Sequence, residues 1–180
     1  MRSINITGKN NIDKINEIEK STYKAVRLHM DNLNDSLLNH KFQNDMIRKM
    51  YLSDSIHYLL NDDFKIAQSL ITRELNNKIQ GYKGQDLKKN THNANTIITM
   101  DNLLEKLVGS MLICYYCKKQ IMVLYKNVRE QSQWTLDRID NSLSHTNNNT
   151  CISCLKCNLQ RKVMNSDKFK FTKNLKINKI

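Results

Sequence analysis

Two cysteine pairs in the C-terminal half of the chain have the spacing of a metal site. The first pair is Cys114 and Cys117, the second is Cys154 and Cys157, and two residues separate the members of each pair. Four thiolates on two such turns close a tetrahedral zinc site. The sequence therefore predicts a structural zinc ion that staples together the segment between the pairs.

A fifth cysteine leaves a second metal chemistry open. Cys151 precedes Cys154 and Cys157 in a C-x2-C-x2-C run, a spacing that also suits an iron–sulfur cluster. Cys151 lies in an alternating, strand-like segment, however, where a small buried thiol is the commoner role. Zinc on the four paired cysteines is the favoured interpretation, and iron content would separate the two.

Two side chains beside the cysteine frame have the chemistry of ligands for a hard cation. Asp137 falls in a predicted strand over 134–139, and Asn158 follows the last cysteine in a predicted helix over 155–164. If zinc holds that helix against that strand, the two side chains converge, and their oxygens suit Mg²⁺ or Mn²⁺. Such a cation would polarise a phosphate and stabilise its leaving oxygen. Taken alone, Asp137 also suits a turn and Asn158 a helix cap.

Helical periodicity dominates the first hundred residues. Apolar residues recur every three or four positions over 11–39, 44–60 and 62–80, and Gly81 is expected to end the third helix. The polar segment 81–95 is then predicted to be a linker or surface loop.

The pattern changes again after residue 95. Thr99 or Asp101 is expected to open another helix, and beyond the first cysteine pair the short apolar segments 121–125 and 150–153 predict two further strands. The whole pattern predicts an α+β protein, in which a mostly helical N-terminal region precedes a small zinc-stapled finger.

This pattern divides the chain into three parts. We expect a helical region over 1–100, for DNA contact or dimerisation, a finger domain over 101–165 and a basic tail over 166–180. The stretch 168–180 has five lysines and no acidic residue, so it either touches phosphate or is a solvated tail.

Charge and composition favour a nucleic-acid partner. The net charge is +12, from 29 Lys and Arg against 17 Asp and Glu, and such an excess favours a polyanion. No apolar run of about 18 residues is present, so no membrane span is expected. The N-terminus lacks the apolar stretch of a signal peptide, which predicts an intracellular, reducing environment where cysteines bind metal rather than form disulfides.

Taken together, these motifs resemble the HNH (His-Asn-His) nuclease family. The resemblance is carried by Leu136-Asp-Arg-Ile-Asp-Asn-Ser-Leu-Ser-His-Thr146, by Asn149 and by Cys154-Leu-Lys-Cys157-Asn158, after the first cysteine pair. It covers roughly residues 110–175. The pattern is similar to the zinc-stapled branch that includes recombination endonuclease VII of phage, and to HNH-type proteins of large DNA viruses. Upstream, the segment Gly81-Tyr-Lys-Gly-Gln-Asp86 is weakly similar to those viral relatives.

The resemblance implies a ββα-metal finger with one catalytic divalent cation, Mg²⁺ or Mn²⁺. It implies that Asp137 and Asn158 bind this cation and that Asn149 braces the loop between the strands. The implied activity is metal-dependent hydrolysis of phosphodiester bonds in DNA.

One position departs from the family pattern. The family usually has a histidine as general base directly after the aspartate, and this chain has Arg138 there. An arginine stays protonated and cannot act as a base, although it can clamp a phosphate with two hydrogen bonds. His145 is then the candidate base because its ordinary pKa suits that role, and Asp140 is the other candidate, as base or as additional metal ligand.

Three functions therefore remain open from the sequence. The first is an HNH endonuclease, in which DNA is contacted by Arg138, Lys156, Arg161 and Lys162. The alternative is a zinc-containing nucleic-acid-binding protein without catalysis, which the arginine at the base position favours. The third is a structural zinc module with a helical arm that binds a partner, such as a second copy of the chain.

Overall fold

The computed structural model describes Lys9, Arg27 and residues 34–52, 62–91 and 96–175. Within these residues the protein mixes helix and strand, as predicted, with five α-helices and a two-stranded antiparallel sheet. In chain order the elements are η2 (Asp35–Leu38, a 3-10 helix), α2 (His40–Leu52), α3 (Asp62–Lys88), α4 (Met100–Ser110), β1 (Trp134–Arg138), β2 (Thr150–Cys154), α5 (Leu155–Arg161) and α6 (Ser166–Asn174).

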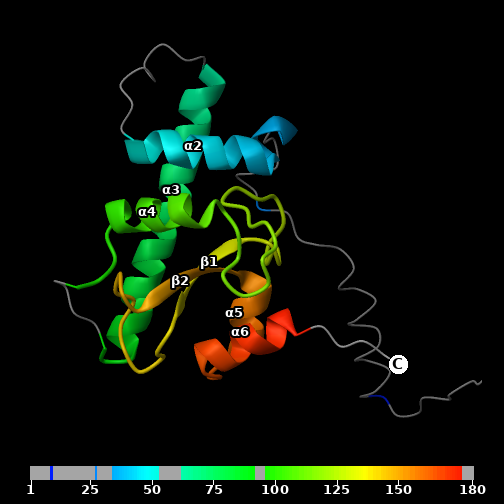
Figure 1. Cartoon of the computed structure of the whole chain (residues 1–180). Helices are drawn as coiled ribbons and strands as arrows, with labels where there is room; N and C mark the ends of the chain where they lie inside the picture. Colours follow the sequence, from blue (N-terminus) through cyan, green and yellow to red (C-terminus); the bar gives the residue numbers. More distant parts are fainter. Residues whose placement is uncertain (1–8, 10–26, 28–33, 53–61, 92–95, 176–180) are drawn as a thin grey trace, which may run out of the picture.

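Two helices cross the long helix α3 in the upper part of the molecule. Figure 1 shows α2 and α4 crossing α3, which continues down to the level of the sheet, while the sheet and the two C-terminal helices lie below α2 and α4. Apolar side chains of all three helices are buried at these crossings, among them Met46, Ile47, Ile71, Leu75, Leu103 and Leu107. Burial of this kind is the main stabilising term of a small domain, so the crossings fix the direction of α3.

Helix α3 is longer than the sequence indicates. The predictions of a stop at Gly81 and of a loop from that residue are wrong, because the helix continues to Lys88. A glycine inside a helix costs about 1 kcal/mol relative to alanine. Tyr82 and Asp86, one turn apart, are nonetheless buried by tertiary contacts, which outweigh the local preference. Residues 92–95 of the predicted loop lie outside the described residues.

The other predicted helices are found with shifted ends. Helix α4 begins where predicted, since Thr99 caps it by accepting a hydrogen bond from the Asn102 amide at 3.3 Å. Helix α2 begins at His40, earlier than predicted, and the predicted end of that helix lies outside the described residues, as does most of the first predicted helix. None of the described helices is both long and apolar enough to cross a membrane.

The sheet consists of two of the three predicted strands. Strands β1 and β2 pair antiparallel, with Trp134 opposite Cys154 and Arg138 opposite Thr150. The prediction of a strand over 121–125 is wrong, because the segment makes an isolated bridge between Met122 and Gln133 instead of a continuous ladder, and the amides that follow bond to a side chain. The amides of Val123 and Leu124 donate to the Gln43 side chain of α2, at 2.8 and 3.0 Å.

The C-terminal segment is packed rather than free. Residues predicted as a basic tail form α6, whose Phe169 is buried against the ring of Tyr116, with 5.0 Å between the ring centroids. Residues 176–180 lie outside the described residues.

Helix α3 is attached directly to the edge of β1. The Leu136 amide donates a hydrogen bond to the Tyr82 hydroxyl at 2.8 Å. The Lys78 ammonium donates to Gln133 Oε1 at 3.1 Å and to the Trp134 carbonyl. Burial lowers the pKa of Lys78 to about 7, although Glu74 opposes the shift. These contacts cross from the predicted helical region into the predicted finger domain.

Candidate functional site

The four paired cysteines form a cluster. The sulfur atoms of Cys114, Cys117, Cys154 and Cys157 all lie within 4.8 Å of one another. Three of the four side chains are buried and Cys117 is half-buried. Four thiols at this spacing are compatible with one structural metal ion such as zinc, as the sequence predicts.

Backbone amides point at the sulfurs of this cluster. The Cys154 amide donates to Cys114 Sγ at 3.3 Å, and the Cys157 amide donates to Cys154 Sγ at 3.4 Å. The first cysteine turn is tight, with Lys118 in the left-handed region at φ 58°. Amide donors favour the thiolate form of cysteine, which is the form that binds metal.

Cys151 stands apart from the cluster. Its sulfur lies 3.6 Å from the Tyr116 hydroxyl, and it is not among the four clustered thiols. Burial raises the pKa of the Cys151 thiol to about 12, although the contact with Tyr116 opposes the shift. The geometry therefore favours a four-cysteine site over the C-x2-C-x2-C arrangement of an iron–sulfur cluster.

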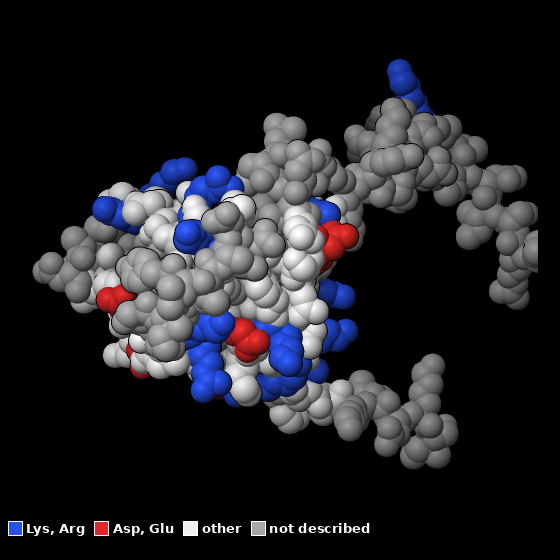
Figure 2. Space-filling view, turned by 90° about the horizontal axis from the view of Figure 1, so that it is seen from above, with Lys and Arg blue, Asp and Glu red and all other residues white. Residues whose placement is uncertain are grey.

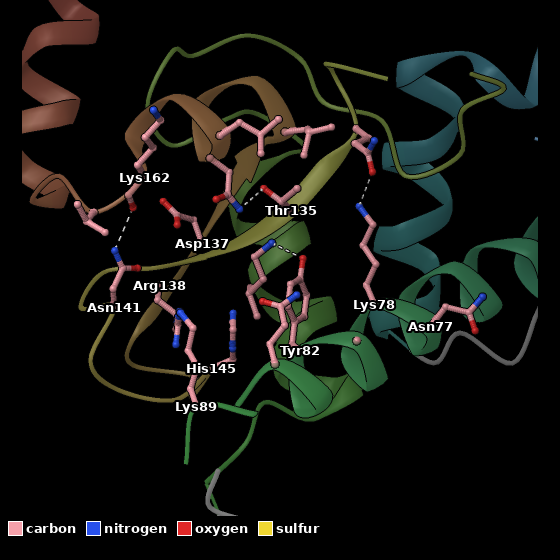
Figure 3. A pocket seen from close by; sticks show the side chains of 18 residues that line it. Asn77, Lys78, Tyr82, Lys89, Thr135, Asp137, Arg138, Asn141, His145 and Lys162 are labelled. Atoms are coloured by element: carbon pink, nitrogen blue, oxygen red, sulfur yellow. Dashed lines mark hydrogen bonds between the residues drawn. The ribbon is translucent and has the colours of Figure 1, made fainter. Parts of the chain in front are cut away.

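A cleft of about 610 Å³ lies between α3 on one side and β1 with α5 on the other (Figure 3). Polar side chains of both walls face it. The predicted site residues that line it are Asp137, Arg138, His145, Asn158 and Lys162. The tertiary fold thus gathers these five residues at one place.

His145 forms a buried pair with a carboxylate from α3. Its Nδ1 lies 2.7 Å from Asp86 Oδ1, and its backbone amide donates to Asp86 Oδ2 at 2.8 Å. A carboxylate at Nδ1 fixes the tautomer with the proton on that nitrogen, which leaves a lone pair on Nε2. The part of the chain that the structure describes supplies no hydrogen bond to Nε2, so this nitrogen is available as a base.

The surroundings of His145 keep it neutral. Burial lowers the pKa of His145 below its ordinary value of 6.5, the hydrogen bond that Nδ1 donates to Asp86 opposes this, and nearby Arg138 and Lys89 add to the lowering. The Tyr82 ring stacks on the imidazole, with 4.7 Å between the ring centroids. A neutral, oriented imidazole is the form that accepts a proton from water.

Arg138 shares the carboxylate that holds His145. Its Nη1 donates to the Leu143 carbonyl at 3.1 Å and lies 3.7 Å from Asp86 Oδ1. The positive charge of Arg138 lies beside the fully buried Asp86 side chain and disfavours a second positive charge on His145. Arg138 lines the cleft, but part of its guanidinium is committed to these two contacts.

Asp137 is held mainly by Arg161. Arg161 Nε donates to Asp137 Oδ2 at 2.6 Å and Nη2 donates to Oδ1 at 2.8 Å, while the Tyr116 hydroxyl donates to Oδ2 at 2.7 Å. A carboxylate offers roughly four lone-pair positions. Three are used by these donors, so one position on Oδ1 remains for a cation.

Arg161 differs from the DNA contact expected of it. Its side chain is buried, and its other donors bond to the carbonyls of Arg138 and Met164 and to the Asn141 side chain. A guanidinium that is buried in this way, with Nε and Nη2 bonded inside the protein, is poorly placed to bind a phosphate. Its role in this structure is to fix α5 to β1.

Asn158 lies across the cleft from α3. The Nδ2 group donates to Thr135 Oγ1 at 3.1 Å, which orients the amide oxygen away from that hydroxyl. Asn158 is half-buried and lines the same cleft as Asp137 and His145. Its oxygen and the remaining position on Asp137 are the hard ligands that this wall offers.

The loop between the strands is closed by Asn149. Its Nδ2 donates to the carbonyls of Asp140 and Ser144 at 2.9 and 3.0 Å, and its Oδ1 accepts from the Asp140 amide at 2.9 Å. These bonds shape the segment that carries His145. Asn149 is therefore placed to position His145 rather than to touch a ligand.

The other predicted site residues lie outside the cleft or at its rim. Asp140 is exposed and accepts from the Ser142 hydroxyl at 2.7 Å, which holds the pKa of Asp140 below its ordinary value and makes it a weaker base. Lys156 is exposed near the cysteine cluster instead. Lys162 is exposed at the end of α5 and faces the cleft.

Sequence reasoning missed Asp86 and Tyr82. Both lie in the segment predicted to be a loop, and Asp86 is 59 residues before His145. The weak likeness of Gly81–Asp86 to the viral proteins was the one signal that pointed to them.

Comparison of the chain with protein-family models, curated proteins and solved structures gave no match. Its function is therefore inferred from the site itself and from the motif resemblance.

Proposed function

We propose that the protein is a metal-dependent DNA endonuclease of the HNH type that hydrolyses phosphodiester bonds in the cleft between α3 and β1. The observation that carries this proposal is the Asp86–His145 pair, with Nε2 of a neutral histidine available as a base. The cationic side chains of Lys89, Arg138 and Lys162 line the same cleft and suit an anionic substrate.

The proposed reaction begins with a water molecule next to His145. Nε2 accepts a proton from the water as its oxygen attacks phosphorus, the new P–O bond forms, and the bond to the leaving oxygen breaks. The leaving oxygen then takes up a proton from solvent. Asp86 stabilises the imidazolium that forms, and Lys162 offsets the charge of the phosphate.

The residues on the opposite wall fit a divalent cation. Asn158 and the remaining position of Asp137 would hold Mg²⁺ or Mn²⁺, which would neutralise charge on the phosphate and its leaving oxygen. Arg161 is bonded to the same Asp137 carboxylate, so this ion would be held more weakly than by a carboxylate without such a partner.

The order of the elements also supports the proposal. Strand β1, a loop with His145, strand β2 and helix α5 follow one another, and Asn158 lies in the first turn of α5, directly after the last cysteine. This is the order that the resemblance implies for a ββα-metal finger stapled by zinc.

The Asp137–Arg161 ion pair favours a second candidate, a zinc-containing nucleic-acid-binding protein without catalysis. An arginine that neutralises the expected metal ligand reduces cation affinity, and Arg138 occupies the usual base position. Under this alternative the cleft binds a phosphate group but does not activate water.

Nicking of supercoiled plasmid with Mg²⁺ or Mn²⁺ tests the proposal. Wild-type protein should nick the plasmid, and His145→Ala should lower the rate by at least about 100-fold, because a positioned base contributes that much or more. Asp86→Asn should cause a smaller loss. Asp140→Asn, outside the cleft, is the matched control and should keep the rate.

Two outcomes would decide against parts of the proposal. Wild-type protein that binds DNA and cuts it with neither metal supports the non-catalytic alternative. Undiminished nicking by His145→Ala removes His145 from the mechanism, while loss of nicking in Asn158→Ala with retained zinc supports the cation site.

A further inference from the structure

A row of polar side chains on α3 leads away from the cleft. Residues four apart on a helix form a ridge inclined by about 26° to the axis. On α3 the row that we name the α3 track consists of Lys65, Ser69, Arg73, Asn77, Gly81, Gln85 and Lys89. Every residue of the track is exposed, and the last four line the cleft. The helical turn extends to Lys89, whose amide donates to the Gln85 carbonyl at 3.1 Å.

The α3 track carries positive charge and no negative charge. Between Phe64 and Lys89 the only acidic residues are Glu74 and Asp86, and both are buried. Glu74 bonds to Arg27 at 2.8 Å, and Asp86 bonds to His145. A helix face that is merely solvated usually mixes both signs of charge. Helix α3 opens with Asp62 and Asp63, but from Phe64 onward its acids point inwards and its exposed residues are cationic or neutral.

The surface around the start of α3 has the same bias. Figure 2 views the molecule from the end at which α3 begins, and Lys and Arg predominate over Asp and Glu on the face that it shows. Lys83 and Lys88 add two more exposed cations along the helix. The field of this end of the molecule thus attracts a polyanion toward the track and the cleft.

The dimensions of the track suit a DNA duplex. A helix rises about 1.5 Å per residue, so the track advances about 36 Å along the axis of α3, close to one turn of B-form DNA, while it winds around the helix. Ser69 and Gly81 are small, and a Cβ added at Gly81 would meet nothing within 4 Å. A sugar-phosphate backbone can therefore approach the helix closely at these positions. The track has no aromatic side chain on which unpaired bases could stack, which argues against a single strand.

We infer that the α3 track binds the sugar-phosphate backbone of double-stranded DNA and guides one strand into the cleft. That the partner is DNA rests on the proposed function. That the binding surface is the α3 track rests on the charge of the track, its exposure and its continuity with the cleft. Contacts of this kind position a duplex without reading its sequence.

Fluorescence anisotropy with a labelled duplex of about 20 base pairs, two turns of DNA, tests the inference. The background is full-length His145→Ala protein without added Mg²⁺ or Mn²⁺, so binding is measured without cleavage. The double variant Lys65→Glu/Arg73→Glu should raise Kd by at least about tenfold. Arg73→Gln should lower the salt slope of binding by about one, as loss of one phosphate contact does.

The matched control is Lys41→Glu, an exposed charge reversal at the start of α2 and outside the track. It should change Kd far less than the double variant, and equal thermal melting of all variants excludes unfolding as the cause. The inference is overturned if the double variant has the same Kd as the His145→Ala background. It is also overturned if the double variant has the same Kd as the Lys41→Glu control. If a single strand or duplex RNA binds with the same affinity as duplex DNA, and that affinity also depends on the track, the assignment to double-stranded DNA is overturned.

Failure of this inference and failure of the proposed function give different results. Track-dependent binding without any nicking by wild type refutes the nuclease and retains the track. Nicking by wild type, together with a Kd that the track substitutions leave unchanged, refutes the track and retains the nuclease. Absence of DNA binding refutes both.

Discussion

The cysteine cluster and the Asp86–His145 pair are both small groups of side chains brought together by the fold, but they depend on different information. The four cysteines come in two pairs of identical spacing, and each turn places two sulfurs near each other. Asp86 and His145 are 59 residues apart and come from a helix and from the loop between the strands. The first group is encoded by local chemistry and the second by the way in which α3 packs on β1.

The two regions are also held by different forces. Metal ligation would hold the cluster, whereas contacts of Tyr82 and Lys78 with β1 hold α3 in place behind His145. Asp137 lies between the regions, because it is bonded to Arg161 of α5 and lines the cleft. Changes at the Asp86–His145 pair should therefore leave the cysteine cluster intact.

The largest effect is expected from the cluster. Cys154→Ser should abolish metal binding and the cooperative folding of the segment around β1, β2 and α5, because a structural zinc ion contributes on the order of 10 kcal/mol. Zinc content per chain and a near-UV circular dichroism melt measure the two effects. Cys151→Ser, outside the cluster, should keep its zinc. Full zinc content and an unchanged melt for Cys154→Ser would show that the cluster is not the staple.

The next largest effect is expected at the ion pair between the regions. Arg161→Ala should lower the free energy of unfolding by about 3–5 kcal/mol, since it leaves the buried Asp137 carboxylate without its main partner. Urea unfolding measures the loss. The double variant Asp137→Asn/Arg161→Ala should lose less than the sum of the single variants. A loss of less than about 1 kcal/mol for Arg161→Ala would mean that Asp137 is held by something else.

A smaller effect is expected from the pH dependence of His145. Its pKa is lowered in the folded protein, so the unfolded chain binds the proton first as pH falls. The stability that His145 contributes is therefore complete above its ordinary pKa of 6.5, and it is lost as pH falls from there to the folded pKa. Urea midpoints between pH 5 and pH 8, the usual range for histidine, measure this loss, which His145→Gln should lack.

The nicking rate offers a second measurement of the same group. The rate should fall on the acid side with an apparent pKa below 6.5, because the neutral imidazole is the active form. An apparent pKa above that value would contradict a buried, neutral base.

The smallest effect is expected at the glycine inside α3. Gly81→Ala should raise the free energy of unfolding by about 0.5–1 kcal/mol, since alanine favours the helix and the added Cβ meets nothing within 4 Å. Gly84→Ala, with equally open space, should behave in the same way. Urea unfolding measures both, and a loss of stability would show that the helix needs glycine there.

Much of the fold around the cleft can be predicted from the sequence. The two paired strands, the start of α4 and the helix after the last cysteine follow from hydrophobic pattern, capping and spacing. The irregular segment over 121–125 does not, because its pairing stops at an isolated bridge of Met122 and the amides of Val123 and Leu124 donate to the Gln43 side chain of α2. No local pattern reveals a partner so far along the chain.

By itself the sequence determined the two cysteine pairs that form the cluster, the excess of positive charge, and five of the residues that line the cleft, namely Asp137, Arg138, His145, Asn158 and Lys162. These features depend on residue types and on short spacings along the chain, and both can be read directly from the sequence. Only the tertiary structure decided that α3 continues past Gly81, that Asp86 holds His145 and that Arg161 binds Asp137 instead of facing solvent. Partners of buried charges are chosen by packing between distant elements, because a carboxylate removed from water binds whichever donor the fold places beside it.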